Sequence, residues 1–519
     1  MLRNLLTVGG WTMLSRLLGL VRDQLLAIFL GAGPLQDAYQ VAFRIPNMFR
    51  RLLGEGAFNA AFVPLFTAQY EEKGPEKALR FAGQAMAVLL AWLVIFALLC
   101  EIFMPLVISF IAPGFKHGDA SRYTLAITLT RITMPYMVFI CCAALIAGIL
   151  NARHHFGVAA AAYVSFNIVG ITAILIGAFG IHDVPLSSAW GITISGIIQL
   201  GALLWAARRF HLLPRFSWPG HNPDITLLLR RIAPGLVGSG VTQLNLAIDT
   251  IISTLLPAGS ISWLYFADRI NQLPLGVLGS ALGTTLLPLL TQHVVAKNIT
   301  GMQQSLNKAL DYALLLTLPA TFGLIALAPL IMSGLFGYGH FTHHDFINSA
   351  QCLQAYALGL PAFILVKLLA PAFFAQGDTK TPVYIGLFTL VLNLAFNLLF
   401  YRSLAHIGPP LASTLSGIIN LCLLAFILWR KGLFRPDGRA IKRYGKITLA
   451  CTVMGLSAYT TLHLFLPQAP DWSAFPRLTA LGSLIAANIL FYGVLLVLFR
   501  LVSPSDLLSL IRRRFKRSA

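Results

Sequence analysis

Long apolar runs separated by short polar segments follow one another along almost the whole chain. A run of about 20 apolar residues is long enough for an α-helix to cross the hydrocarbon core of a membrane. The pattern therefore predicts an all-α polytopic membrane protein with fourteen transmembrane helices. The predicted spans are residues 4–31, 36–68, 83–112, 124–151, 158–180, 187–207, 226–256, 262–294, 308–336, 350–376, 382–402, 409–430, 446–467 and 478–501.

The composition agrees with this pattern. Only 11% of the 519 residues are charged, against about 25% in a soluble domain, and the mean hydropathy is +0.76. The first apolar run follows Met-Leu-Arg without a small-residue cleavage site, so the first span is expected to be retained. The six cysteines lie in apolar stretches without metal-ligand spacing, and they are expected to be small buried hydrophobic residues.

The formal net charge of +20 reflects the way in which basic residues are distributed between loops. Loops after even-numbered spans are basic, above all residues 430–446, and so is the segment 512–517. The opposite loops carry only Lys116, Arg122, Arg402 and Arg477. The positive-inside rule then places both termini in the cytoplasm. The basic residues are expected to meet anionic lipid rather than nucleic acid.

A shift of 226 residues aligns several polar or shape-bearing positions of the chain with one another. The matched pairs are Asp23 with Asp249, Tyr39 with Tyr265, Pro135 with Pro361 and Asn167 with Asn393. The repeat predicts two six-helix lobes, residues 1–220 and 221–437, related by a parallel pseudo-twofold axis along the membrane normal. Residues 438–519 lie outside the repeat and hold two extra C-terminal helices and the basic tail. Two such lobes are expected to enclose a central cavity.

Charged residues recur inside the predicted spans, where each costs about 2.5–3.5 kcal/mol near a helix centre. Arg16 and Arg22 lie far from either membrane border, so we expect them to face a water-filled cavity. Arg44, Asn47, Arg51 and Glu55 share a helical stripe, and the pattern allows Arg44 and Arg51 to face either the cavity or the membrane border. Because guanidinium groups bind phosphate and carboxylate in a bidentate way, the cavity is expected to accept an anionic head group.

Three segments of the sequence resemble one family. They are SRLLGLVRDQLLAIFLGAG (15–33), DAYQVAFRIPNMFRRLLGEGAFNAAFVPLF (37–66) and SWLYFADRINQLPLGVLGSALGTTLLPLL (262–290). They resemble the MurJ (MviN) lipid II flippases of the MOP exporter superfamily. The resemblance implies a role in peptidoglycan and cell-wall biogenesis, and hence in cell shape. The protein would move lipid II, an undecaprenyl-pyrophosphate-linked disaccharide-pentapeptide, from the inner to the outer leaflet of the cytoplasmic (inner) membrane by alternating access.

The resemblance also implies which residues bind the substrate. The matching positions are Arg16, Arg22, Asp37, Arg50, Glu55, Asp268 and Arg269. The family favours Arg50 where a straight helix favours Arg51, so a bend near Pro46 is expected. Spans 13 and 14 resemble a helix pair that lines a groove for the lipid tail.

Some members of the family bind sodium, and Asp249, Asn393, Asn397 and Thr414 match that site in part. Asn397 occupies the position where a carboxylate is expected. Coupling of transport to sodium and coupling to protons therefore both stay open as alternatives. No other cofactor is expected, and the protein is expected to act as a monomer.

Three other functions are retained as alternatives. They are a flippase for another polyprenyl-linked glycan, a multidrug exporter of the same superfamily, and a scaffold without transport activity. An exporter of cationic drugs would be expected to line its cavity with carboxylates rather than arginines. The sequence contains no phosphate-binding glycine loop, HExxH motif or nucleophile elbow, so an enzyme is not expected.

Overall fold

The structure, a computed structural model, describes residues 2–54, 57–118, 120–220, 222–435 and 438–502, and these contain helices and no β-strand. The chain divides into two compact units. Unit 1 comprises residues 1–262 and 338–342, and unit 2 comprises residues 263–337 and 343–519. This division follows packing, whereas the predicted lobes follow a sequence repeat, and the lobe boundaries stay a prediction.

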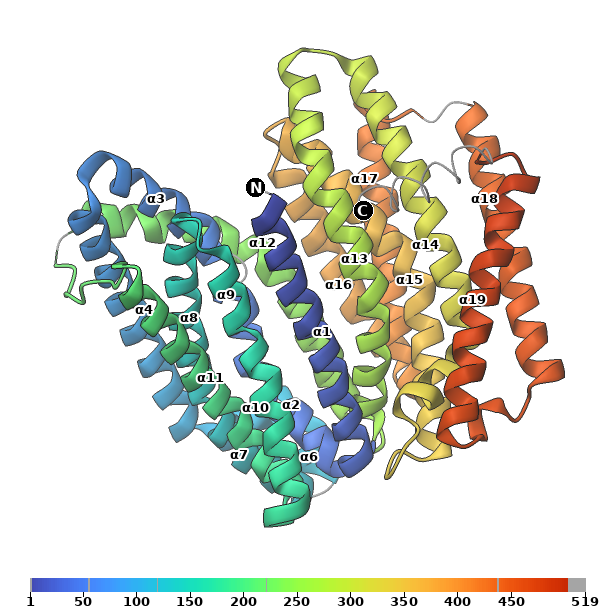
Figure 1. Ribbon diagram of the computed structural model, residues 1–519, viewed down its shortest axis with the longest axis horizontal. Helices are drawn as coiled ribbons and strands as arrows, with labels where there is room; N and C mark the ends of the chain where they lie inside the picture. Colours follow the sequence, from blue (N-terminus) through green and yellow to red (C-terminus); the bar gives the residue numbers. More distant parts are fainter. Residues whose placement is uncertain (1, 55–56, 119, 221, 436–437, 503–519) are drawn as a thin grey trace. The chain divides into compact units, whose positions relative to one another are not determined.

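Unit 1 is built from helices α1 to α12 and the first residues of α13 (Figure 1). The bounds are α1 Leu2–Leu30, α2 Pro34–Phe49, η1 Arg50–Gly54, α3 Ala57–Lys73, α4 Pro75–Ile102, α5 Met104–Ile111, α6 Pro113–Gly118, α7 Ala120–Thr133, α8 Pro135–Ala152, α9 Phe156–Ala162, α10 Val164–Ile176, η2 Gly177–Ile181, α11 Val184–Arg209 and α12 Pro223–Thr254. The core of unit 1 forms around α8, whose side chains from Ile140 to Leu150 are all buried.

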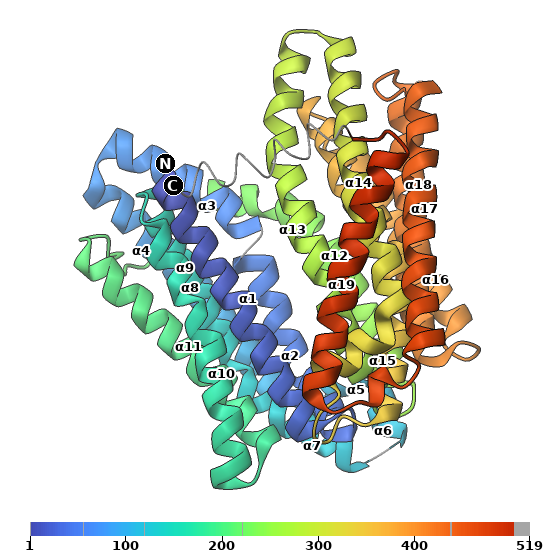
Figure 2. The ribbon, with the colours of Figure 1, turned by 45° about the vertical axis from the view of Figure 1, so that its right-hand side comes forward.

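Unit 2 continues from α13 to α19. The bounds are α13 Ser260–Val295, α14 Ile299–Phe336, α15 His343–Ala375, α16 Lys380–Phe400, η3 Ala405–Ile407, α17 Gly408–Arg430, α18 Gly438–Thr460, η4 Thr461–Phe465, η5 Ala469–Asp471 and α19 Ala474–Leu498. Its apolar core includes residues of α13 to α17. The two C-terminal helices, α18 and α19, pack against α14 and against each other (Figure 2), and Tyr492 Oη donates a hydrogen bond to Leu315 O at 2.9 Å.

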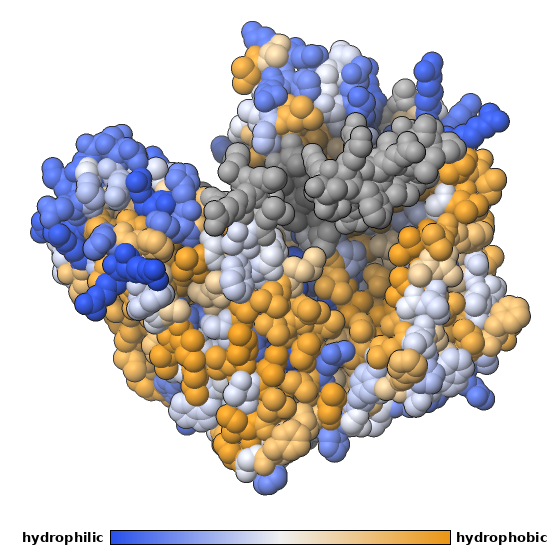
Figure 3. Space-filling view, in the orientation of Figure 1, coloured by the Kyte–Doolittle hydropathy of each residue, from blue (hydrophilic) through white to orange (hydrophobic). Residues whose placement is uncertain are grey.

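Within the described part of the chain, ten helical segments are long and apolar enough to cross a membrane. They coincide with predicted spans 3–6 and 9–14. Where the structure describes them, the other four predicted spans are helical as well, in α1, in α2 with η1 and α3, in α12 and in α13. Figure 3 shows apolar side chains over the middle of the helices and hydrophilic ones gathered toward their ends. The chain is therefore a multi-pass membrane protein, and the count of fourteen spans stays a prediction.

Several predicted spans are divided into shorter helices, and spans 2 and 4 show this at a π-helical turn and at a proline. Predicted span 2 is divided into α2, a π-helical turn over Arg50–Gly54, and α3. Pro46 lies inside α2, so the change of helix geometry comes at Arg50 rather than at the proline. Span 4 is divided between α7 and α8 at Pro135, which begins α8 because proline is accepted at the first position of a helix.

The segment between α11 and α12 packs against the N-terminal part of α4 and is hydrogen-bonded to it. Arg215 N donates to Leu79 O at 3.1 Å, and Lys73 pairs with Asp224 at 3.0 Å. A Cβ atom on Gly83 would lie 1.8 Å from Arg215 O, so glycine is required where the two backbones meet. These contacts fix the N-terminal end of α12 to unit 1.

The C-terminal end of α12 is fixed to unit 1 in the same manner. Gly114 N, in α6, donates to Thr254 Oγ1 at 3.3 Å, and a Cβ atom on Gly114 would lie 1.9 Å from Thr254 O. The two close contacts explain why α12 packs with the helices before it, although the repeat assigns residues 221–256 to the second lobe.

Candidate functional site

Asp37, in the first turn of α2, binds the beginning of α13. Its carboxylate accepts hydrogen bonds from Gly259 N at 2.7 Å, Ser262 N at 3.0 Å and Ser262 Oγ at 2.6 Å. The first backbone N–H groups of a helix lack intrahelical acceptors, and a carboxylate near them is favoured by the helix dipole. Asp37 is 1% exposed, so this interaction takes place away from water.

Arg122 completes the surroundings of Asp37, and the prediction that it lies in a loop is wrong. We expected a loop residue, but Arg122 lies in α7, is 6% exposed, and has its Nη1 atom 3.4 Å from Asp37 Oδ2. Its guanidinium also lies over the ring of Phe115, 4.1 Å from the ring centre. The apolar run begins at residue 124, two residues after Arg122, so hydrophobicity alone gave no signal for this burial.

Arg22 packs between α1 and α10. Its Nε and Nη2 atoms donate to Asp23 Oδ1 at 3.2 and 2.8 Å, and its guanidinium lies 5.0 Å from the centre of the Phe166 ring. A Cβ atom on Gly170 would lie 2.9 Å from Arg22 Cδ, so glycine leaves the space that the arginine chain occupies. Arg22 is thus a buried, charge-paired residue in unit 1, and its role with substrate stays a prediction.

The remaining predicted arginines of unit 1 differ in exposure. Arg16, on α1, is exposed, whereas Arg50, at the start of η1, is half-buried. Arg50 Nε donates to Asn47 Oδ1 at 3.1 Å. Glu55 lies outside the described residues.

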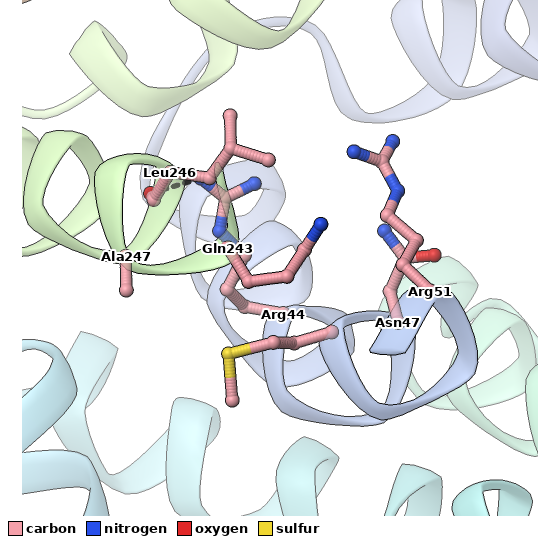
Figure 4. Close-up of a pocket in the computed structure, with 7 residues that line it drawn as sticks. Arg44, Asn47, Arg51, Gln243, Leu246 and Ala247 are labelled. Carbon is pink, nitrogen blue, oxygen red and sulfur yellow. Dashed lines mark hydrogen bonds between the residues drawn. The ribbon is translucent and has the colours of Figure 1, made fainter. Parts of the chain in front are cut away.

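Arg44 and Arg51 line a pocket in unit 1 between α2, η1 and α12 (Figure 4). The pocket contains about 250 Å³ of space not filled by protein atoms and is open to solvent. Its lining residues are Arg44, Asn47, Met48, Arg51, Gln243, Leu246 and Ala247. Arg44 Nη2 donates to the backbone oxygen of Leu246 on α12. The structure thus assigns both arginines to a polar pocket.

Asp268 and Arg269 lie next to each other on α13 in unit 2, and both are half-buried. Gln272 Nε2 donates to Asp268 Oδ1 at 3.2 Å. The structure places this pair one helical turn from the beginning of unit 2, and its role with substrate stays a prediction.

The residues that match a sodium site belong to both units. Asn393 and Asn397 lie on one face of α16, where Asn397 Nδ2 donates to Asn393 O at 3.0 Å. Thr414 Oγ1, on α17, donates to Ala355 O at 2.8 Å. Amide and hydroxyl oxygens of this kind suit a hard cation, but the carboxylate of the set, Asp249, belongs to unit 1. Unit 2 alone therefore supplies neutral donors, and the described residues contain no cluster of three or more His, Cys, Asp or Glu side chains able to hold a metal ion.

The arrangement suits recognition of an anionic group rather than bond chemistry. Arg16, Arg22, Arg44, Arg50 and Arg51 all lie on the first two predicted spans of unit 1. Arginine supplies a planar set of donors that matches the oxygen atoms of phosphate and carboxylate. The first two predicted spans thus carry five arginines, of which Arg22 is paired with Asp23.

The family model described as "Lipid II flippase MurJ" matches residues 26–478. A curated relative from Rhizobium meliloti, named a probable lipid II flippase MurJ, is 36% identical over 534 residues, covering 100% of this chain and 97% of the relative. A relative from Burkholderia cenocepacia, named lipid II flippase MurJ, is 32% identical over 508 residues, covering 96% of this chain and 97% of the relative.

Two solved structures are similar over most of the chain. One, titled "Lipid II flippase MurJ, inward closed conformation", has a TM-score of 0.80 and 27% identity, and it covers 95% of this chain and 98% of its own. The other, an inward-facing multidrug resistance MATE transporter of the MOP superfamily, has a TM-score of 0.70, 14% identity, and covers 81% of this chain and 94% of its own. At that identity the second structure shows likeness of fold alone.

Proposed function

The chain belongs to the MurJ family of lipid II flippases, which are transporters rather than enzymes, and from that premise we propose that it moves lipid II between the leaflets of the cytoplasmic membrane. Transfer would run from the inner to the outer leaflet by alternating access. The arginines would contact the pyrophosphate of the head group.

The observation that carries the proposal is the concentration of arginine on α1, α2 and η1. Charged residues inside membrane helices are costly and mark the paths of polar substrates. A hydrogen bond to a charged group contributes about 1.5–3 kcal/mol, so several arginines can offset the loss of hydration of a pyrophosphate. A cationic substrate would instead be repelled by the same groups.

The test of this proposal is replacement of the arginines that match the family. Arg16→Ala, Arg22→Ala and Arg269→Ala should each abolish growth of cells depleted of the native protein, and lipid II should accumulate in the inner leaflet. Arg430→Ala, at the C-terminal end of α17, is the matched control and should grow normally. Normal growth of all three variants at normal protein level would contradict the proposal. Accumulation of a different polyprenyl-linked glycan would favour the alternative substrate.

The orientation of the chain is part of the proposal. The experiment starts from a variant without native cysteines, because Cys422 is exposed and could react itself. In this background His182→Cys should react with a membrane-impermeant thiol reagent added outside the cell. Arg435→Cys should react only after the membrane is opened, since the basic residues around 430–446 hold that loop in the cytoplasm. The reverse pattern would invert the protein and exclude the proposed direction.

We further propose that α18 and α19 form a groove for the polyprenyl tail. Each CH₂ group left in water costs about 0.8 kcal/mol, so a long tail requires an apolar path. Charged substitutions on the inward faces of 446–467 or 478–501 should slow transfer of full-length lipid II more than that of a short-chain analogue. A chain shortened to residue 440 that inserts and still transfers lipid II would exclude the groove.

Sodium or proton coupling and a monomeric state complete the proposal. Asp249, Asn393, Asn397 and Thr414 would hold sodium through their side-chain oxygens. Transfer in vesicles should then slow when sodium is replaced by potassium, and Asn397→Leu should remove that difference. A rate that depends on pH alone would favour protons.

A further inference from the structure

The pocket lined by Arg44 and Arg51 presents hydrogen-bond donors from three elements. Arg44 and Asn47 come from α2, Arg51 from η1, and Gln243 from α12. Figure 4 shows the Gln243 side chain reaching into the space between the two guanidinium groups. None of the seven lining residues is acidic, while Met48, Leu246 and Ala247 form the apolar part of the wall.

Two hydrogen bonds fix how these donors are presented. Arg44 is held against α12 by its bond to Leu246 O, so its guanidinium is positioned before any ligand arrives. The Arg50 Nε–H group can only donate, so the Asn47 atom that it meets is the oxygen Oδ1. The Asn47 Nδ2 amide, which can only donate, is then the group that remains for the pocket.

The pocket is open on one side, so one group of a larger molecule can enter it. Its 250 Å³ of space includes part of the surrounding solvent. A ligand group can therefore reach the two guanidinium groups while the rest of the molecule stays outside. The donors on the wall match the oxygen atoms of a single carboxylate or phosphate group.

We propose that Arg44, Asn47, Arg51 and Gln243 form a second oxyanion-binding site, which takes one carboxylate or phosphate group of the transported head group. The site consists of residues other than Arg16, Arg22, Arg50 and Arg269, the arginines that match the family, and Arg50 adjoins it through its hydrogen bond to Asn47. The inference rests on the proposed function, because it assigns a second contact to the same substrate. It gives Arg44 and Arg51 a role in specificity.

The test measures binding by the purified full-length protein in detergent. One ligand is lipid II, and the second is lipid II whose peptide carboxylates have been converted to amides. Arg51→Gln should weaken binding of unmodified lipid II about tenfold or more, as expected for loss of one charge-assisted contact, since about 1.4 kcal/mol is tenfold. Arg51→Lys should restore binding only in part, because lysine lacks the planar pair of donors.

Further variants separate binding from folding. Arg44→Gln removes a pocket donor and also the hydrogen bond to Leu246 O, so its effect on binding would be mixed with an effect on packing. Gln243→Leu is therefore the second variant, because it removes a pocket donor and leaves that hydrogen bond in place. Met48→Leu, in the apolar part of the wall, is the matched control and should bind like the wild type. Binding is compared only among variants whose melting temperature and elution volume equal those of the wild type.

The two ligands distinguish the two sources of the oxyanion. A loss confined to unmodified lipid II supports the site and identifies a carboxylate, and an equal loss for both ligands supports it and identifies a phosphate. If folded Arg51→Gln and Gln243→Leu bind both ligands like the wild type while Arg16→Ala does not, this inference is overturned and the proposed function stands. If the wild type binds neither ligand, the proposed function itself fails, and this inference with it.

Discussion

Replacement of Asp37 by asparagine tests whether its carboxylate holds the beginning of α13 in place. Asparagine has nearly the same shape but only one acceptor oxygen. If that oxygen keeps Ser262 N and Ser262 Oγ, the new amide group faces two donors, Gly259 N and Arg122 Nη1. The substitution therefore loses two charge-assisted hydrogen bonds and leaves Arg122 buried without its carboxylate.

The magnitude follows from these contacts. Hydrogen bonds to charged groups contribute about 1.5–3 kcal/mol each, and removing one partner of a buried ion pair costs about 3–5 kcal/mol. The Arg122 contact is long, at 3.4 Å, so the two contributions are not added in full. We expect the free energy of unfolding to fall by about 3–5 kcal/mol, which is the value for a broken buried pair alone. At roughly 1–2 °C per kcal/mol for a chain of this size, the melting temperature should fall by roughly 3–10 °C.

The assay is thermal unfolding of the purified protein in detergent, followed by intrinsic fluorescence. Ser262→Ala removes one of the four contacts and should give a smaller loss than Asp37→Asn. Asp224→Asn is the matched control, because Asp224 pairs with Lys73 at the surface, and such pairs contribute about 0–1 kcal/mol. If Asp37→Asn melts no lower than Asp224→Asn, the carboxylate does not stabilise this junction and the reasoning is refuted.

Two further predictions concern unit 2. Arg477 is 5% exposed and donates hydrogen bonds to Gly337 O at 2.8 Å and to Pro470 O at 3.2 Å. Arg477→Gln should therefore lower the melting temperature by several degrees and speed proteolysis after residue 466. Unchanged melting and proteolysis would contradict this. Lys431 and Thr381 hold the pKa of Asp378 at about 2, below its usual 3.8, so its stabilising effect is complete above about pH 4 and is lost as the pH falls toward 2. The melting temperature of the wild type should exceed that of Asp378→Asn slightly at pH 7, by an amount that shrinks below pH 4, and a difference that grows at low pH would contradict the assigned ion pair.

The apolar pattern predicted the helices well because burial in lipid is a local property of each segment. Ten predicted spans coincide with apolar helices. The other four spans were predicted from apolar runs in the same way, and they are helical where the structure describes them. The π-helical turn at Arg50–Gly54 was not predicted, because no residue type marks such a turn as proline marks a kink.

The contacts of the charged residues were less predictable than their positions. Asp37 meets residues more than 200 positions away in sequence, and only the tertiary fold brings such residues together. Arg122 and Arg477 were expected in loops because each lies just outside an apolar run, yet both are buried against helix ends or carboxylates. Hydropathy counts each residue alone, whereas burial of an arginine depends on the acceptors around it.

Helix α12 is fixed within unit 1 at both ends, by the backbone contact of Arg215 with Leu79 and Gly83 ahead of its start and by the contact of Thr254 with Gly114 at its last residue. A rod fixed at two points cannot tilt as a whole, so any motion of α12 must be bending between them. Gln243, Leu246 and Ala247 lie in the half of α12 that ends at the fixed Thr254, so the α12 wall of the pocket would act as a rigid support for an anion held by α2.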